Sequence, residues 1–125
     1  MSKKIIVVTG GAGFVGANLI LKLLTNTKYK IISIDNYSSG SFKNHLADRR
    51  IKYVTDSTSN IAKILNKKKS NIHTIFHFGE FSRIYQSFLR MDECIKSNSI
   101  GSHAVFNFCL SNRIKLVYSA TSASI

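Results

Sequence analysis

Short apolar runs alternate along this chain with longer segments in which apolar residues recur at the spacing of a helix. Most of these runs are rich in isoleucine and valine, as strands buried on both faces are. The alternation predicts repeated strand–helix units around a parallel sheet, that is, a doubly wound α/β fold. We expect five strands in the order 3-2-1-4-5, and their predicted bounds are 4–9, 30–35, 51–54, 74–78 and 115–119.

Between these strands the sequence predicts helices at 14–24, 61–68 and 92–112, with a less regular helix at 84–90. Each helix should lay one apolar face on the sheet. In the first helix that face is expected to contain Leu19, Leu23 and either Phe14 or Val15. In the last helix it is expected to contain a longer set, namely Ile95, Ser102, Val105, Phe106, Cys109 and Leu110.

A chain of 125 residues has room for one domain of ordinary size. Its 44% hydrophobic and 19% charged residues are those of a globular chain and exclude a disordered one. The last predicted strand would leave one edge of the sheet unpaired, which complete proteins usually cover. We therefore expect residues 1–125 to be one incomplete domain, the N-terminal five-strand portion of a larger fold.

Three glycines follow the first predicted strand and open the first predicted helix. Gly10, Gly13 and Gly16 have the spacing G-x-x-G-x-x-G. Residues without a side chain let the backbone turn sharply and come close to a pyrophosphate. The free amides at the start of the following helix then face the phosphates with the positive end of the helix dipole. The pattern is typical of a dinucleotide-binding loop, and a purely structural glycine turn is the alternative.

An acidic residue ends the second predicted strand, at the distance from the glycines that this mechanism needs. Asp35 stands 19 residues after Gly16, where a carboxylate can accept hydrogen bonds from both ribose hydroxyls of an adenosine. The same negative charge would repel the 2′-phosphate of NADP. The strand, the glycines and the acid together therefore favour NAD as the cofactor.

These segments resemble the extended short-chain dehydrogenase/reductase family, in particular its NAD-dependent nucleotide-sugar epimerases and dehydratases. The resemblance runs from about Lys4 to Ser124. Residues 9–16, TGGAGFVG, are similar to the cofactor loop of that family. Residues 35–40, DNYSSG, resemble the ribose segment D-N-x-x-x-G of UDP-galactose 4-epimerases and UDP-glucuronate decarboxylases. The resemblance implies the Rossmann fold, bound NAD and a nucleotide-sugar substrate.

The resemblance also implies which residues contact the cofactor. Asp56, after the third strand, would hold the adenine amino group, although Thr55 stands where the family has glycine. Residues 76–80, FHFGE, fall where the family has H-x-A-A or H-x-A-G, and Glu80 departs from that pattern. The full set of implied cofactor contacts is Gly10, Gly13, Phe14, Val15, Gly16, Asp35, Asn36, Ser39, Asp56, Ser57, Phe78, Gly79 and Asn98.

The catalytic hydroxyl of the family corresponds to Thr121, after the fifth strand, where it would bond the sugar oxygen that is oxidised. Ser82 and Arg83 lie in the segment that faces the substrate in relatives, and Arg83 could pair with a sugar-nucleotide phosphate. The remaining catalytic pair of the family is Y-x-x-x-K, in which lysine lowers the pKa of a tyrosine base. None of the five tyrosines here is followed four residues later by lysine. The resemblance therefore implies the NAD-binding portion of such an enzyme, without its C-terminal substrate-binding part.

Two other functions stay open from the sequence. Without the Tyr/Lys pair, the chain can be a truncated, non-catalytic dinucleotide-binding module. The formal charge of +12 can also attract nucleic acid. We expect no nucleic-acid partner, because the lysine run at 67–69 has no interleaved aromatic residues and fits a solvated helix end.

Cysteine and histidine positions indicate neither a disulfide framework nor a metal site. Cys94 and Cys109 do not form a zinc-type pair, and so few cysteines fit the reducing cytoplasm. His73 and His77 are expected along one strand, roughly 13 Å apart, which is too far to share an ion.

No segment approaches the roughly 18 apolar residues that a membrane-spanning helix needs. The resemblance implies that a homodimer can form through helices that include 92–112.

Overall fold

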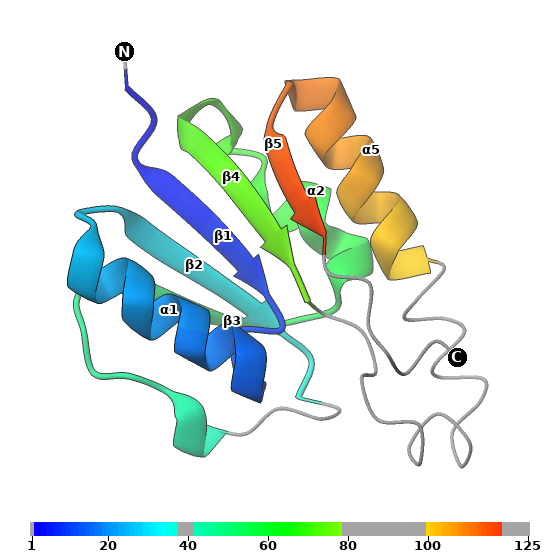
Figure 1. Ribbon diagram of the computed structural model, residues 1–125. Coiled ribbons are helices and arrows are strands. Elements are labelled where there is room, and N and C mark those ends of the chain that lie inside the picture. The colour runs from blue at the N-terminus through cyan, green and yellow to red at the C-terminus, as the bar shows by residue number, and fades with distance from the viewer. Residues whose placement is uncertain (1, 38–41, 79–99, 119–125) are drawn as a thin grey trace, which may run out of the picture.

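The computed structural model describes residues 2–37, 42–78 and 100–118. Five parallel strands form one sheet in the order β3-β2-β1-β4-β5 (Figure 1). The doubly wound α/β class and the predicted strand order are therefore confirmed. The strands are β1 (Ile5–Thr9), β2 (Lys30–Asp35), β3 (Ile51–Thr55), β4 (Ile72–His77) and β5 (Lys115–Tyr118).

Helices cover both faces of the sheet (Figure 1). Helix α1 (Phe14–Asn26) lies on one face, and α2 (Ile61–Leu65) and α5 (Ser102–Asn112) lie on the other. Within the described residues, the connections also contain three short 3-10 helices, which are η1 (Phe42–Asn44), η2 (Thr58–Asn60) and η3 (Lys69–Asn71).

Strand β1 contributes to two apolar cores, because successive side chains of a strand point to opposite faces of the sheet. Val7 belongs to the core under α2 and α5, which also contains Val105. Val8 belongs to the core under α1, which also contains Ile20. All four side chains are completely buried. Burial on both faces explains why the sequence of β1 is an uninterrupted apolar run.

The start of β4 differs from the prediction because of a local irregularity. Ile5 of β1 pairs with Ile72 of β4, whereas the next residue, Ile6, pairs with Thr74. His73 is thus an extra residue in β4, and its side chain is exposed. An extra residue of this kind interrupts the alternation that marks a strand in sequence. The strand therefore begins two residues before its predicted start at 74.

Two predicted helices also have different bounds. Helix α2 ends at Leu65, and the lysine run at 67–69 lies in the turns that follow it. The Lys68 N–H donates to the Leu65 carbonyl at 2.9 Å, the bond of a tighter turn than an α-helical one. Of the predicted helix at 92–112, the part from Ser102 is α-helical, and residues 92–99 lie outside the described residues together with the predicted helix at 84–90.

The predicted buried faces of α1 and α5 are wrong at four residues. Phe14 and Val15 are 81% and 58% exposed, because the first turn of α1 lies at the end of the sheet rather than over it. On α5, Phe106 and Leu110 are 41% and 80% exposed. The predicted Ser102, Val105 and Cys109 are buried, and Phe108, which was not predicted, is buried with them.

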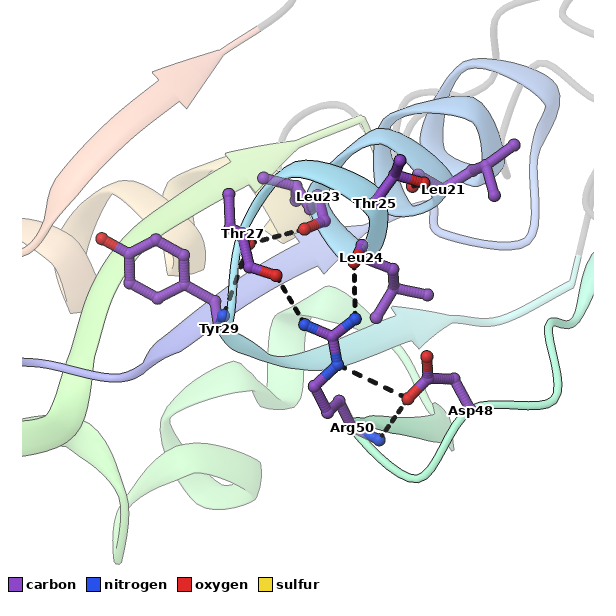
Figure 2. Close-up of polar contacts among 8 residues, drawn as sticks. All are labelled: Leu21, Leu23, Leu24, Thr25, Thr27, Tyr29, Asp48 and Arg50. Carbon is purple, nitrogen blue, oxygen red and sulfur yellow. Dashed lines mark hydrogen bonds and ion pairs between the residues drawn. The ribbon is translucent and has the colours of Figure 1, made fainter.

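The C-terminal end of α1 is held by Arg50, which immediately precedes β3 (Figure 2). Its guanidinium donates to the carbonyls of Leu24 at 2.5 Å and Thr27 at 2.6 Å. Its Nε lies 3.6 Å from the carboxylate of Asp48. A cation at this position satisfies carbonyls that a helix end leaves unpaired and complements the helix dipole. Arg50 therefore ties α1 to the start of β3.

Cys109 and the two histidines of β4 lie where the sequence places them. Cys109 packs in the core, and its burial raises the pKa of the thiol to about 11. His73 and His77 lie on the same strand. Within the described ranges, no helix has the length and apolar character needed to cross a membrane.

Candidate cofactor site

The carboxyl ends of the parallel strands meet at one edge of the sheet, where β1 leads into α1 (Figure 1). Gly10 follows β1, Asp35 ends β2, Asp56 follows β3 and Phe78 follows β4. In open α/β sheets, ligands bind at this edge, beside the strand from which the chain winds outward in both directions. The structure thus brings predicted cofactor residues from four strands to one edge, centred on β1.

The three glycines of the G-x-x-G-x-x-G pattern differ in the space that their surroundings leave for a side chain. Gly10 has a φ of 73°, which favours glycine. A Cβ on Gly16 would lie 2.2 Å from the Gly10 carbonyl oxygen, so packing requires glycine there as well. A Cβ on Gly13 would meet the same oxygen at an ordinary 3.4 Å. Packing within the described chain therefore leaves space at Gly13, as a loop that receives a ligand would.

The N-terminus of α1 follows directly from this loop. The Ala17 N–H donates to the Gly13 carbonyl at 2.8 Å, which is the first bond of the helix. The first turn contains no acidic residue, and within the described chain no side chain caps it. The amides of residues 14–16 precede that first bond, and Phe14 and Val15 are exposed. An uncapped helix start beside an open glycine is suited to a phosphate group.

The carboxylate of Asp35 is held next to this loop. Its Oδ2 accepts a hydrogen bond from the Ala12 N–H at 3.1 Å, and its Oδ1 accepts one from the Tyr37 N–H at 2.7 Å. An ionised carboxylate has about four acceptor positions, so two such bonds leave acceptor capacity for ribose hydroxyls. Asn36, which follows Asp35, is exposed at the same edge. These residues fit the adenosine ribose of a dinucleotide.

Sequence reasoning missed a cluster of polar and aromatic residues beside Asp35. Tyr37 has a left-handed φ of 61°, and its hydroxyl is hydrogen-bonded to Nε2 of His45. Burial, followed by the charge of Asp35, raises the pKa of Tyr37. His45 also stacks on Tyr53 of β3, with ring centroids 3.8 Å apart. These partners are brought together by the fold alone, so no local motif could have revealed them.

Asp56 lies beside Asp35, because its N–H donates to the Asp35 carbonyl at 3.1 Å. Its Oδ1 accepts hydrogen bonds from the Asn60 side chain at 2.8 Å and from the Ser57 N–H at 2.7 Å. These two bonds lower the pKa of Asp56. Ser57 caps η2 by accepting a bond from the Ser59 N–H at 3.2 Å. The second carboxylate oxygen of Asp56 has no partner among the described residues.

A buried network joins the ends of β1 and β4 to α5. The Phe78 N–H donates to both the carbonyl and the hydroxyl oxygen of Thr9, at 3.0 and 2.9 Å. The Thr9 hydroxyl also lies 2.6 Å from Nδ1 of His77, whose Nε2 lies 3.0 Å from the Ser102 hydroxyl. Because His77 is completely buried, the network supports the edge of the sheet on which the glycine loop stands.

Comparison with known proteins gives the family. The family model for the NAD-dependent epimerase/dehydratase family matches residues 6–125. The chain belongs to the NAD-dependent epimerase/dehydratase family. NAD is accordingly the cofactor of this family. The open glycine, the uncapped helix start and the anchored carboxylate are suited to bind it.

Relatives within this epimerase/dehydratase family cover the chain almost completely. It is 30% identical over 135 aligned positions to the bifunctional protein GAL10 of Candida maltosa, covering 100% of this chain and 86% of that protein. It is 31% identical to the ADP-L-glycero-D-manno-heptose-6-epimerase of Alkalilimnicola ehrlichii, over 94% of this chain and 37% of that protein.

The chain has the same fold as a solved structure of a UDP-glucose 4-epimerase from Thermotoga maritima with UDP-glucose. It superimposes with a TM-score of 0.82 at 28% identity, over 94% of this chain. The matched part is 38% of that chain. The present chain therefore spans less than half of the length of this solved relative.

Several site residues predicted from the epimerase/dehydratase resemblance lie outside the described residues. They are Ser39, Gly79, Ser82, Arg83, Asn98 and Thr121. The described part of the site holds the remaining predicted cofactor residues around the ends of β1, β2, β3 and β4.

Proposed function

We propose that the chain is the NAD-binding portion of a nucleotide-sugar epimerase or dehydratase that acts by transient oxidation of the sugar with bound NAD. The observation that carries this proposal is the Asp35 carboxylate, held beside the glycine loop by the N–H groups of Ala12 and Tyr37. Family membership and the likeness to a UDP-glucose 4-epimerase support the reaction class.

In this proposal each described residue has a role in holding the cofactor. The open backbone at Gly13 and the first amides of α1, including those of Phe14 and Val15, bind the pyrophosphate. Asp35 accepts hydrogen bonds from the ribose hydroxyls, and the second oxygen of Asp56 accepts one from the adenine amino group. Bound NAD supplies a hydride acceptor that later returns the hydride to the sugar.

The substrate side of the proposal rests on the sequence resemblance. Thr121 bonds the sugar hydroxyl that is oxidised, and Arg83 pairs with a phosphate of the nucleotide sugar beside Ser82. Ser39, Gly79 and Asn98 complete the cofactor contacts. A tyrosine base assisted by lysine has to come from outside these 125 residues, since no Y-x-x-x-K occurs in them.

We further propose a cytoplasmic protein that pairs with a second copy of itself. The buried, free thiol of Cys109 fits a reducing compartment. The exposed apolar side chains of Phe106 and Leu110 on α5 support a contact between two copies through this helix.

Calorimetric titration of the 125-residue chain with NAD, and separately with NADP, tests the cofactor site. We expect saturable binding of NAD and at least about tenfold weaker binding of NADP, because its 2′-phosphate would face the Asp35 carboxylate. Asp35→Asn keeps the size of the side chain and removes its charge, and it should weaken NAD binding. Asp48→Asn removes an acid that lies away from the site and should leave NAD binding unchanged. A wild-type chain that folds and binds neither dinucleotide would contradict the proposal.

A further inference from the structure

The peptide groups of Ala12 are held from two directions by residues far away in the sequence. Ala12 lies between Gly10 and Gly13 and is completely buried. Its N–H donates to the Asp35 carboxylate at 3.1 Å, and its carbonyl accepts a hydrogen bond from the Asn44 side-chain amide at 2.7 Å. A loop of glycines has almost no side chains to pack, so hydrogen bonds to its backbone decide its conformation.

Asn44 is itself held in place by its neighbours. It is the last residue of η1, and the next residue, His45, lies between two tyrosines. The Tyr37 hydroxyl is hydrogen-bonded to the His45 ring, and the Tyr53 ring stacks on its face. The Tyr53 hydroxyl also accepts a bond from the Leu46 N–H at 2.8 Å. Residues 44–46 are thus tied both to the end of β2 and to β3.

We infer that Asn44 is a positioning residue that holds the pyrophosphate-binding loop in its binding conformation through the Ala12 carbonyl. His45, fixed by Tyr37 and Tyr53, determines where Asn44 stands. This inference rests on the proposed function, since it assumes that the loop binds a pyrophosphate. It adds a residue 32 positions away from Ala12 that acts through the backbone of the loop.

The chemistry of the contact determines which substitutions remove it. The Ala12 carbonyl needs a hydrogen-bond donor, and alanine has none, so Asn44→Ala leaves that carbonyl without its side-chain partner. Asn44→Asp has nearly the same shape and places a carboxylate oxygen against the carbonyl oxygen. Asn26 is a matched control, because its amide also donates to a main-chain carbonyl, that of Lys22 at 3.1 Å, at the opposite end of α1.

Titration of each 125-residue chain with NAD, ADP and adenosine provides the test. We expect Asn44→Ala and Asn44→Asp to weaken binding of NAD and ADP about tenfold, since loss of one partly buried hydrogen bond corresponds to roughly that factor. Adenosine lacks the pyrophosphate and meets mainly Asp35 and Asp56, so its affinity should change less than about twofold. Asn26→Ala should leave the affinities for all three ligands unchanged.

Amide hydrogen exchange of the unliganded chains provides a second measurement. Residues 10–13 should exchange faster in Asn44→Ala than in the wild type or in Asn26→Ala. If the wild-type chain binds NAD and both Asn44 variants bind NAD and ADP with unchanged affinity, the inference is overturned and the proposed function is not. An equal loss for all three ligands together with a lower melting temperature would also overturn it, because that result indicates a merely structural role. A folded wild-type chain that binds no NAD would overturn the inference and the proposed function together.

Discussion

Thr9 and His77 stand opposite each other in the register of β1 and β4, and the Thr9 hydroxyl lies 2.6 Å from Nδ1 of His77. The other ring nitrogen of His77 meets Ser102 of α5 at 3.0 Å. One completely buried imidazole therefore joins the centre of the sheet to the helix that covers it.

Replacing His77 by alanine should lower the free energy of unfolding by about 2–4 kcal/mol, because it removes both hydrogen bonds and leaves a cavity. Urea unfolding followed by circular dichroism measures the change. His73→Ala is the matched control, since it removes a histidine from the same strand whose side chain is exposed. Similar losses in the two variants would show that the buried network contributes nothing specific.

Arg50→Ala removes the guanidinium and should lower the free energy of unfolding by about 1–2 kcal/mol, since two helix-end carbonyls lose a charged donor. Arg50→Lys should recover little of this loss, because an ammonium cannot reproduce the planar fork that reaches both carbonyls. Thermal unfolding of these variants beside Arg49→Ala, a change at the exposed neighbouring arginine, tests the expectation. Full stability of Arg50→Lys would show that charge alone is needed.

Alanine substitutions at two loop glycines should separate packing from ligand binding. Gly16→Ala should lower stability strongly, because its Cβ would lie 2.2 Å from a backbone oxygen. Gly13→Ala has an ordinary contact of 3.4 Å and a φ of −80°, so the free chain should stay as stable as the wild type. NAD binding should nevertheless weaken in Gly13→Ala. Unfolding curves and NAD titrations of the same two samples measure both effects. Unchanged NAD affinity in Gly13→Ala would contradict the proposal that the space at Gly13 receives the pyrophosphate.

The Cys109 thiol should react slowly with a chromogenic disulfide reagent at neutral pH, because burial raises its pKa from 9.0 to about 11. The stability that goes with the protonated thiol is fully present below pH 9.0 and is lost as the pH rises through about 11. A Cys94→Ser background leaves Cys109 as the only thiol to be followed. Reaction as fast in the native chain as in the urea-unfolded chain would contradict this expectation.

The strands were predictable because burial on both faces leaves a nearly continuous apolar run, as in β1. The same reasoning failed at the start of β4, where His73 is an extra and exposed residue. It also failed for the first turn of α1, because helical spacing identifies an apolar stripe and not where the sheet ends. Phe14 and Val15 therefore satisfy the pattern and still lie in solvent.

Within the site, Gly10 and Asp35 were predictable because each follows from a local rule about loops after strands. Asn44 and His45 were not, since an asparagine and a histidine in a connecting segment have no distinguishing pattern. Their roles arise only when the chain returns to the loop 32 residues later. Tertiary hydrogen bonds of this kind are invisible to spacing and composition.

The position of β1 in the middle of the sheet sets the order in which the site can be completed during synthesis. When β1, β2 and β3 have emerged from the ribosome, they can form a half-sheet in which β1 is still an open edge. Its other neighbour, β4, ends at His77, and the Phe78 N–H is the group that bonds Thr9. The glycine loop thus acquires its final surroundings only after residue 78 has been made, although all of its own residues are translated well before that residue.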